Sequence, residues 1–449
     1  MRTIESAANA APATLSEAVA PSSSSGSEFI FLGMPDINGS IRGKAFRPEA
    51  FESALRSGTM ITDLVLALDP TDAPITDYQE FGSRSGAGDL ILRPDPTTLH
   101  ALTWRPGWRI CLATPYWRDG RLCDLASREV YRRVLDGLAA SGHEALAALE
   151  YEVRFWDADG RALSTGLSYS FSELHRFEAF AEALAPALAG LGVELSAIHT
   201  EAGPGLLELN LAARPGMRSA DDAALTKLAV KDLASSIGLR ASFLAKSAPG
   251  EEGSSGHIHL SCWKDGRNAF RATEGSLPAL LRSAIGGLLE HLPAASLLMN
   301  PTVNSYKRLV PGWFAPTNVS WGPENRSAAV RAILHADHPE LCRLECRRPG
   351  ADANPYLALA ATVAAVTDGI SRATSPPAAV DGDAAARDDL PALPASLDEA
   401  LAAFTADTRL REALGVEFST YYAISRKWEL KAWQRTVSEW ERDRYLRTV

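Results

Sequence analysis

The chain has little of what marks a membrane protein or a nucleic-acid-binding protein. No apolar run in its 449 residues approaches the roughly 20 residues that are needed to cross a bilayer. The formal net charge of -10 argues against nucleic acid, because phosphate backbones select basic surfaces. We therefore predict no membrane and no nucleic-acid partner. An acidic chain can still bind anionic small molecules, since a site needs only local positive charge.

Cysteine is scarce and scattered, which argues against a disulfide framework and for reduced thiols in the cytoplasm. The five residues are Cys111, Cys123, Cys262, Cys342 and Cys346. Cys342 and Cys346 are four apart, but no second cysteine pair completes a zinc set, so we expect them to be structural. Residues 1–28 are rich in Ala, Ser and Pro and lack the apolar core of a secretory signal. We predict a disordered N-terminal tail there.

Short apolar runs broken by turn residues predict a small strand-rich domain over residues 29–115. Residues 116–449 alternate helical and strand-like patterns, which predicts a larger α+β domain. The expected strands cover residues 29–33, 61–68, 89–92, 110–114 and 149–156, and the expected helices residues 127–141, 172–190 and 219–238.

The last part of the chain begins with a Pro-, Ala- and Asp-rich segment over residues 372–395, for which we predict an exposed loop. Two or three helices are expected after it. The last of them carries Trp428, Trp433 and Trp440 at helical spacing. We interpret this aromatic stripe as core or subunit contact rather than as a ligand site.

Charged and imidazole side chains recur at every second residue in several strand-like segments, a spacing that places them on one face of a strand. The residues are Glu150 and Glu152, His257 and His259, Arg343, Glu345 and Arg347, and more loosely Glu201 and Glu208. Two carboxylates on a strand are usually only its solvated face. Taken together, however, so many charges on half-buried strands need metal ions or anionic ligands to neutralise them.

The residue types indicate which ligands these are. Carboxylates with one or two imidazoles suit Mg²⁺ or Mn²⁺, and arginines beside them suit phosphate, which they can bind bidentately. That combination favours phosphoryl transfer from a nucleotide. The usual phosphate-binding motifs, a G-x-x-x-x-G-K-[ST] loop or a kinase signature, are absent from the sequence.

Several ordered motifs resemble the glutamine synthetase family. They are residues 300–312 (NPTVNSYKRLVPG), 325–327 (NRS) with Arg331, 253–261 (GSSGHIHLS) and 354–357 (NPYL). The Glu150/Glu152 pair precedes them, Glu345 lies between them, and the match covers about residues 30 to 449. The resemblance implies a small N-terminal β-grasp domain and a large catalytic domain built on a curved antiparallel sheet. It also implies a ring-based homo-oligomer, a dodecamer of two hexamers, with active sites between subunits.

The resemblance assigns roles residue by residue. Two or three Mg²⁺ or Mn²⁺ ions would be held by Glu150, Glu152, Glu201, Glu208, His257 and Glu345. His259, Ser261, Arg331 and Arg343 match nucleotide-binding positions, with ATP as co-substrate. Arg308 and Arg347 match the arginines that bind the carboxylates of glutamate, beside Gly253, and Arg326 matches the one that steadies the transferred phosphoryl group. The implied catalytic residues are Arg326, Arg308 and Glu208, and the implied activity is that of an ADP-forming carboxylate–amine ligase.

The chain departs from the family pattern where the nitrogen donor binds. A flap Glu that serves ammonia-using members is replaced by Phe314, next to Trp313, and of the ammonium-binding Asp motif only Asp89 has a counterpart. Ammonium needs an anionic partner and a base, whereas aromatic side chains suit an organic amine. The pattern resembles the γ-glutamyl-amine ligases, which act on polyamines, ethanolamine, alkylamines or aryl amines.

Two further departures concern the acid substrate: Leu206 stands where the family has Gln, and Glu252 where it has an Asn that helps to hold the amino acid. Glutamate is favoured, although a related acid is possible. The leading hypothesis is a ligase that forms a γ-glutamyl amide from glutamate and an organic amine through a γ-glutamyl phosphate. The alternatives are an ammonia-using glutamine synthetase and a catalytically silent regulatory homologue. The sequence does not name the amine, the ring stacking or the pathway.

Overall fold

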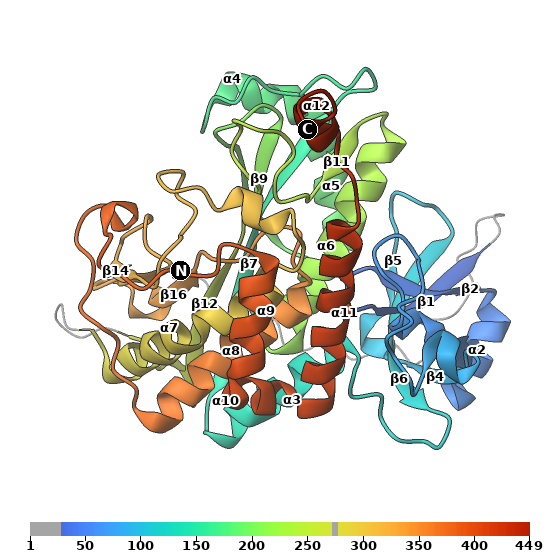
Figure 1. Cartoon of the computed structure of the whole chain (residues 1–449). Helices are drawn as coiled ribbons and strands as arrows, with labels where there is room; N and C mark the ends of the chain where they lie inside the picture. The colour runs from blue at the N-terminus through green and yellow to red at the C-terminus, as the bar shows by residue number, and fades with distance from the viewer. Residues whose placement is uncertain (1–27, 272–276) are drawn as a thin grey trace.

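The computed structural model describes residues 28–271 and 277–449, so the predicted tail lies outside the described residues except for Glu28. Among the described helices, none combines the length and the apolar character that crossing a membrane requires. Two sheets organise the molecule, a six-stranded one near the N-terminus and a ten-stranded one in the body (Figure 1). The predicted α+β class, with a small N-terminal β domain and a large sheet-and-helix domain, is confirmed.

The N-terminal sheet, blue in Figure 1, has the order β2-β1-β6-β4-β3, and β5 pairs with β6. Its strands are β1 (Phe29–Pro35), β2 (Ile41–Phe46), β3 (Thr59–Thr62), β4 (Asp89–Pro94), β5 (His100–Ala101) and β6 (Trp108–Trp117). Only β1 and β6 run parallel. Helix α2 (Pro48–Ser57) packs on the sheet through Phe51 and Ala54.

The strand predicted over residues 61–68 is wrong beyond Thr62. The Thr62 hydroxyl accepts a hydrogen bond from the Leu64 N–H and begins a 3-10 helix over Asp63–Leu66. The buried Asp63 carboxylate then accepts the Gly82 N–H. Side-chain capping of this kind turns the backbone where apolar content alone predicts a strand.

The large sheet has the order β14-β15-β16-β12-β7-β9-β8, with β10 and β11 on β7 and β13 on β12. Its strands are β7 (Glu144–Trp156), β8 (Leu195–Thr200), β9 (Leu206–Leu211), β10 (Arg214–Pro215), β11 (Arg240–Ser242), β12 (Gly256–Lys264), β13 (Arg267–Asn268), β14 (Trp321–Pro323), β15 (Val330–Ile333) and β16 (Arg343–Cys346). All pairs are antiparallel except β14 with β15. Burial alternates along β7, so Leu149, Tyr151 and Val153 face the core while Glu150 and Glu152 face the other side.

Ten α-helices are described after the N-terminal sheet. They are α3 (Ser127–Ala140), α4 (Phe171–Leu174), α5 (Glu178–Gly190), α6 (Met217–Ser236), α7 (Ala279–Met299), α8 (Pro355–Arg372), α9 (Leu397–Ala406), α10 (Thr408–Leu414), α11 (Val416–Gln434) and α12 (Glu439–Tyr445). Helices such as α3, α6 and α8 pack on the core side of the large sheet. The predicted helix over residues 172–190 is split into α4 and α5 by a 3-10 turn. Helices α7 and α8 touch closely because Gly287 and Gly369 meet without side chains between them.

Helix α11 ties the two sheets together (Figure 1). The Tyr421 hydroxyl donates to the Leu66 carbonyl at 2.6 Å, and the Tyr78 hydroxyl donates to the Tyr421 carbonyl at 2.9 Å. Lys431 pairs with Asp77 at 3.0 Å. These contacts join residues more than 300 positions apart, so the N-terminal sheet is held against the body by the end of the chain.

The tryptophan stripe does not lie on one helix. Trp428 and Trp433 are on α11, whereas Trp440 is on α12, which starts with a capping box at Ser438. Trp428 packs partly against the core, but Trp433 and Trp440 are 51% and 61% exposed. The core interpretation is therefore wrong for those two. Residues 373–395 are mainly exposed, with Val380, Ala384 and Leu393 buried.

Candidate active site

One cavity of about 610 Å³ opens over the face of the large sheet that carries the charges. Seven carboxylates and five arginines line it: Glu150, Glu152, Glu201, Glu208, Glu252, Glu324 and Glu345, and Arg308, Arg326, Arg331, Arg343 and Arg347. Gly253, His257, His259, Trp313 and Phe314 complete the sequence-predicted residues that line it. Ser261 lies instead in an adjoining cavity, whose wall also contains His259 and Arg343.

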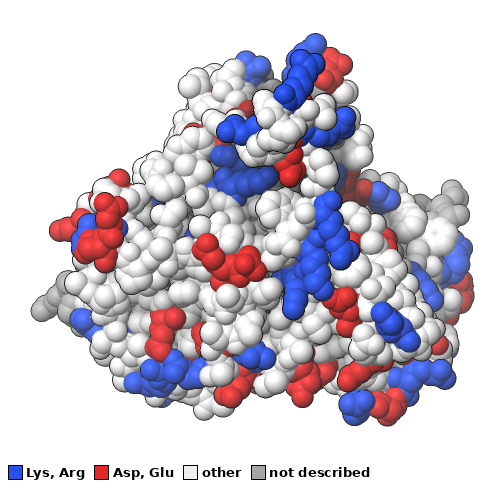
Figure 2. All heavy atoms as spheres, viewed as in Figure 1, with Lys and Arg blue, Asp and Glu red and all other residues white. Residues whose placement is uncertain are grey.

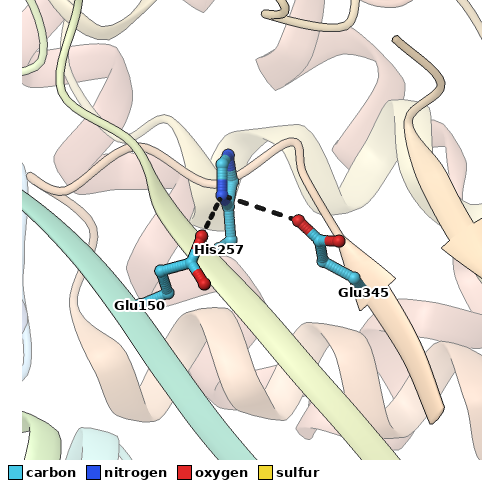
Figure 3. Close-up of side chains that lie close together, drawn as sticks. All are labelled: Glu150, His257 and Glu345. Carbon is cyan, nitrogen blue, oxygen red and sulfur yellow. Dashed lines mark hydrogen bonds and ion pairs between the residues drawn. The ribbon is translucent and has the colours of Figure 1, made fainter. Parts of the chain in front are cut away.

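Three neighbouring strands bring the first acidic group together, as Figure 3 shows. Glu150 comes from β7, His257 from β12 and Glu345 from β16. His257 Nδ1 lies 3.0 Å from Glu150 Oε1 and 3.7 Å from Glu345 Oε1. Each of the three offers one ligand atom, and those atoms lie within 4.8 Å of one another. The group can therefore hold a divalent cation.

Both carboxylates of this group are held in the charged form. Burial tends to raise the pKa of Glu150, but hydrogen bonds from His257 and His259 outweigh it and lower the pKa. Burial also opposes ionisation of Glu345, whereas Arg347, His259 and His257 lower its pKa to about 2. Arg331 Nη1 donates to Glu345 at 3.1 Å. Ionised carboxylates are what a metal ion requires.

The second acidic group consists of His199, Glu201 and Glu208, whose ligand atoms also lie within 4.8 Å. His199 lies 2.8 Å from Glu208 and 3.4 Å from Glu201, and these carboxylates raise its pKa to about 9 against the effect of burial. His199 was not among the predicted site residues, although His199 and Glu201 have the same two-residue spacing as the other groups. Glu152 is the register partner of Glu208. The Glu152 carboxylate accepts a hydrogen bond from the Ser255 N–H at 2.6 Å, and burial raises the pKa of Glu152.

Asn210, also missed, links the two groups. Its side-chain nitrogen donates to Glu150 at 2.9 Å and to Glu208 at 2.8 Å. Nε2 of His257 is buried and has no hydrogen-bond partner among the described residues. The other ring nitrogen of His257, Nδ1, faces the Glu150 and Glu345 carboxylates (Figure 3), and one imidazole nitrogen with two ionised carboxylates is a donor set that suits a divalent cation. The residues present are therefore suited to the Mg²⁺ or Mn²⁺ that the sequence predicts.

The arginines of the cavity differ in burial and in the hydrogen bonds that they make to other protein groups. Arg308 is 2% exposed, and its terminal nitrogens donate to Ser255 Oγ and the Arg348 carbonyl at 3.2 and 2.6 Å. Its stem packs where a side chain at position 253 would clash, so Gly253 makes room for Arg308. Arg343 Nε donates to His259 Nδ1 at 3.1 Å. Arg326 is exposed at the rim of the cavity.

Aromatic side chains form the mouth of the cavity. Phe314 and Tyr169 are 66% and 72% exposed, and both have positive φ, 52° and 53°. Tyr169, a third missed residue, stacks on His199 with ring centroids 4.4 Å apart. Lys246 Nζ lies 4.3 Å from the ring centroid of Trp313. Exposed aromatics in a costly backbone conformation at a cavity mouth are typical of a ligand-binding site.

Basic and acidic side chains of the described residues are interspersed on the face that Figure 2 shows. The cavity, by contrast, gathers seven carboxylates and five arginines in a volume that is typical of a small-molecule site.

Comparisons with known proteins agree with this geometry. A family model described as glutamine synthetase, catalytic domain, matches residues 124–445. A gamma-glutamylethanolamide synthetase of Streptomyces coelicolor is 34% identical over 426 residues, covering 92% of this chain and 91% of that protein. A glutamine synthetase of Thermus thermophilus is 33% identical over 445 residues, covering 94% and 96%. The solved structure of GmaS in complex with ADP has a TM-score of 0.83 and 29% identity, covering 93% of this chain and 96% of that one.

Proposed function

The chain belongs to the glutamine synthetase family of ligases, and from that premise we propose that it joins the γ-carboxylate of glutamate to an organic amine at the expense of ATP. The observation that carries the proposal is the composition of one cavity. Two metal-capable groups and four arginines line its wall, a fifth arginine, Arg326, lies at its rim, and Trp313, Phe314 and Tyr169 line its mouth. The first set suits phosphoryl transfer and the second suits the apolar part of an amine.

Glu150, His257 and Glu345 would hold one divalent cation, and Glu201 and Glu208, with Glu152 or His199, a second. Bound there, Mg²⁺ or Mn²⁺ neutralises negative charge on the phosphates during transfer. Arg331 and Arg343 adjoin the first group and reach the same phosphates. The adjoining cavity, lined by Leu146, Leu211 and Ser261 among others, would receive the nucleoside, which agrees with the nucleotide role predicted for Ser261.

In the first step, a γ-carboxylate oxygen of glutamate attacks the γ-phosphorus of ATP, and the bond to the leaving ADP oxygen breaks. The product is γ-glutamyl phosphate, a far better acyl donor than a free carboxylate. Arg326, at the rim, and Arg347, beside Glu345, supply positive charge to the transferring group and to the carboxylates of the acid. Charge stabilisation of this kind is the main contribution that a protein makes to phosphoryl transfer.

In the second step, the neutral nitrogen of the amine attacks the acyl carbon, loses a proton, and phosphate leaves. The products are a γ-glutamyl amide, ADP and phosphate. Phe314 and Trp313 bury the carbon part of the amine and keep water from the acyl phosphate. An amine that is already neutral at pH 7, such as an aryl amine, needs no base for this step.

The division into a β-grasp domain over residues 29–115 and a catalytic domain over residues 116–449 belongs to the same proposal, as does assembly into a dodecamer of two rings. Exposed Leu167, Phe171, Trp433 and Trp440 are suitable for subunit contacts. Sedimentation analysis of the full chain would test the assembly.

The function is tested by measuring ADP release with glutamate and a panel of ammonia, ethanolamine, alkylamine, aryl amine and polyamine acceptors. We expect at least one organic amine to exceed ammonia in kcat/KM by about tenfold or more. The alternative, an ammonia-using enzyme, is favoured by the similarity to the Thermus thermophilus protein and would be supported if ammonia were the best acceptor. Absence of ADP release with every pair would indicate a catalytically silent homologue.

A further inference from the structure

Asn210 lies where the two metal-capable groups meet, and the strand register explains its place. It is on β9, two residues after Glu208 and therefore on the same face of the strand. The antiparallel pairing of β7 with β9 places Asn210 directly opposite Glu150 and places Glu208 opposite Glu152. Glu150 and Glu208 are thus diagonal neighbours on one face of the sheet, a relation in which backbones are about 7–8 Å apart.

The amide nitrogen of Asn210 bridges these two diagonal carboxylates. Asn210 Nδ2 donates to Glu150 Oε2 at 2.9 Å and to Glu208 Oε1 at 2.8 Å. An amide oxygen in the same place would face two carboxylate oxygens and could donate to neither, so the chemistry allows only the nitrogen there. Asn210 lines both the main cavity and the adjoining one. The bridge therefore borders the space in which ligands bind.

In the first metal-capable group, the bridge orients the Glu150 carboxylate. Glu150 Oε2, which accepts the hydrogen bond from Asn210, also lies 3.3 Å from His259 Nε2. The other oxygen, Oε1, lies 3.0 Å from His257 Nδ1. Asn210 and His259 thus hold one oxygen of Glu150 and leave the other oxygen directed toward the first group.

In the second group, the same amide holds Glu208. Glu208 Oε1 accepts the hydrogen bond from Asn210 and lies 2.8 Å from His199 Nε2. Asparagine suits this position because its amide donates hydrogen bonds and carries no charge. A lysine or an arginine there would neutralise the two carboxylates and repel the cations that they bind.

We propose that Asn210 is a positioning residue on which both metal ions depend, because it orients one carboxylate of each metal-capable group. This inference rests on the metal sites of the proposed function, and in it Asn210 acts through Glu150 and Glu208 rather than as a ligand. A merely structural role of the amide would change the stability of the fold and leave the affinity for metal ions unchanged. A positioning role changes the affinity at both sites through one substitution.

The test is a titration of the full chain with Mn²⁺, followed by calorimetry and by the EPR signal of the free ion, without glutamate, amine or ATP. We expect the wild-type protein to bind two ions. Asn210→Leu keeps the branched shape of the side chain and removes its donors, so it should weaken the binding of both ions by about 10-fold or more. Asn210→Ala should do the same, which separates the loss of the donors from the bulk of leucine. Glu345→Gln, a change in the first group alone, should weaken one ion and leave the other bound.

Asn304→Leu is the matched control. The Asn304 side chain also makes two hydrogen bonds, each of 2.9 Å, but its partners are the backbone N–H and carbonyl of Lys246 rather than carboxylates. This substitution should lower the Tm and leave both Mn²⁺ affinities unchanged.

Weakening of only one ion by Asn210→Leu, or equal weakening by Asn304→Leu, would overturn the inference. A wild-type protein that binds fewer than two ions would overturn it as well. Because no substrate is present in the titration, a protein that fails in the ligase assay can still pass this test, and an active ligase can still fail it.

Discussion

A helical charge cluster and the cavity, both within the described residues, arrange their charged side chains in opposite ways. The helical charge cluster consists of Glu290, His291, Asp368, Arg372, Asp407 and Arg409. His291 is 1% exposed, with Nδ1 2.6 Å from Asp407 and Nε2 2.9 Å from Asp368. Burial lowers its pKa, but the two aspartates outweigh burial and raise it. Three carboxylates face two arginines and this histidine, whose pKa the aspartates raise, so each carboxylate has a partner within the cluster.

The cavity is not balanced in this way. Its seven carboxylates outnumber its five arginines even when His199, whose pKa is raised to about 9, is counted with them. Nε2 of His257 and the Nε atoms of Arg308, Arg331 and Arg347 are buried without partners among the described residues. This difference between matched and unmatched charges distinguishes side chains that stabilise the fold from side chains that bind ligands. Charges matched inside the fold hold helices together, whereas charges left unmatched in a cavity are completed by metal ions and substrates.

The largest effect should come from removing a cavity carboxylate. Glu208→Gln should lower kcat/KM by about 100- to 1000-fold, because it weakens the second metal-capable group. The Tm without metal should change little, because relief of the repulsion from Glu201 and Glu152 offsets the loss of the ion pair with His199. Activity assays and thermal melts with and without Mn²⁺ check this. A variant whose Tm still rises with Mn²⁺ as much as that of the wild type would place the ion elsewhere.

In the helical charge cluster, by contrast, a substitution should lower the stability and leave substrate and metal binding nearly unchanged. His291→Ala should lower the free energy of unfolding by about 3 kcal/mol, because it leaves Asp368 and Asp407 facing each other without the group between them. The KM for ATP and the stabilisation by Mn²⁺ should stay near the wild-type values. Denaturant unfolding measures the first quantity and steady-state kinetics the second. An unchanged unfolding midpoint would show that this cluster does not hold the helices.

A smaller effect is expected at the mouth of the cavity. Phe314→Ala should raise the KM of the best organic amine about 5- to 10-fold, because it removes part of an apolar wall. The KM values of glutamate and ATP should change little. Val416→Ala is the control, since Val416 is 50% exposed and does not line the cavity. Equal effects of the two substitutions on the amine would argue against an aromatic acceptor site.

The smallest expected effect is a pH dependence of the stability that the helical charge cluster contributes. The raised pKa of His291 means that its stabilisation is complete below the unfolded value of about 6.5 and is lost as the pH rises through the folded value. The difference in unfolding free energy between wild type and His291→Ala should therefore shrink from pH 6 toward alkaline pH. Denaturant unfolding at several pH values measures it. A difference that does not change with pH would mean that His291 is neutral in the fold.

Much of the site could be predicted from the sequence, because strand periodicity is local. The two-residue spacing of Glu150 with Glu152 and of His257 with His259 places each pair on one face of its strand, whatever strand lies beside it. The ordered motifs then indicated the family, which the comparisons confirm. His199 lies two residues before Glu201, so the same spacing could have identified it as a site residue.

Other features depended on strand order or on side-chain caps, neither of which strand periodicity reveals. Strand order placed Glu208 between Glu152 and His199, and the Thr62 cap ended a strand that apolar content extended to Leu68. The capping box at Ser438 separated Trp440 from Trp433. None of these follows from local periodicity, because each is a choice among competing hydrogen bonds.

The sequence by itself determined which residue types can bind cations and phosphate, and on which face of each strand they lie. Only the tertiary structure decided which charges neutralise one another and which remain for a ligand. Coulombic energy depends on the distance between side chains and on their burial, and both are set when strands far apart in the chain become neighbours. Glu251 and Glu252 illustrate this: adjacent in sequence and identical in chemistry, one is paired with Arg154 and the other faces the cavity.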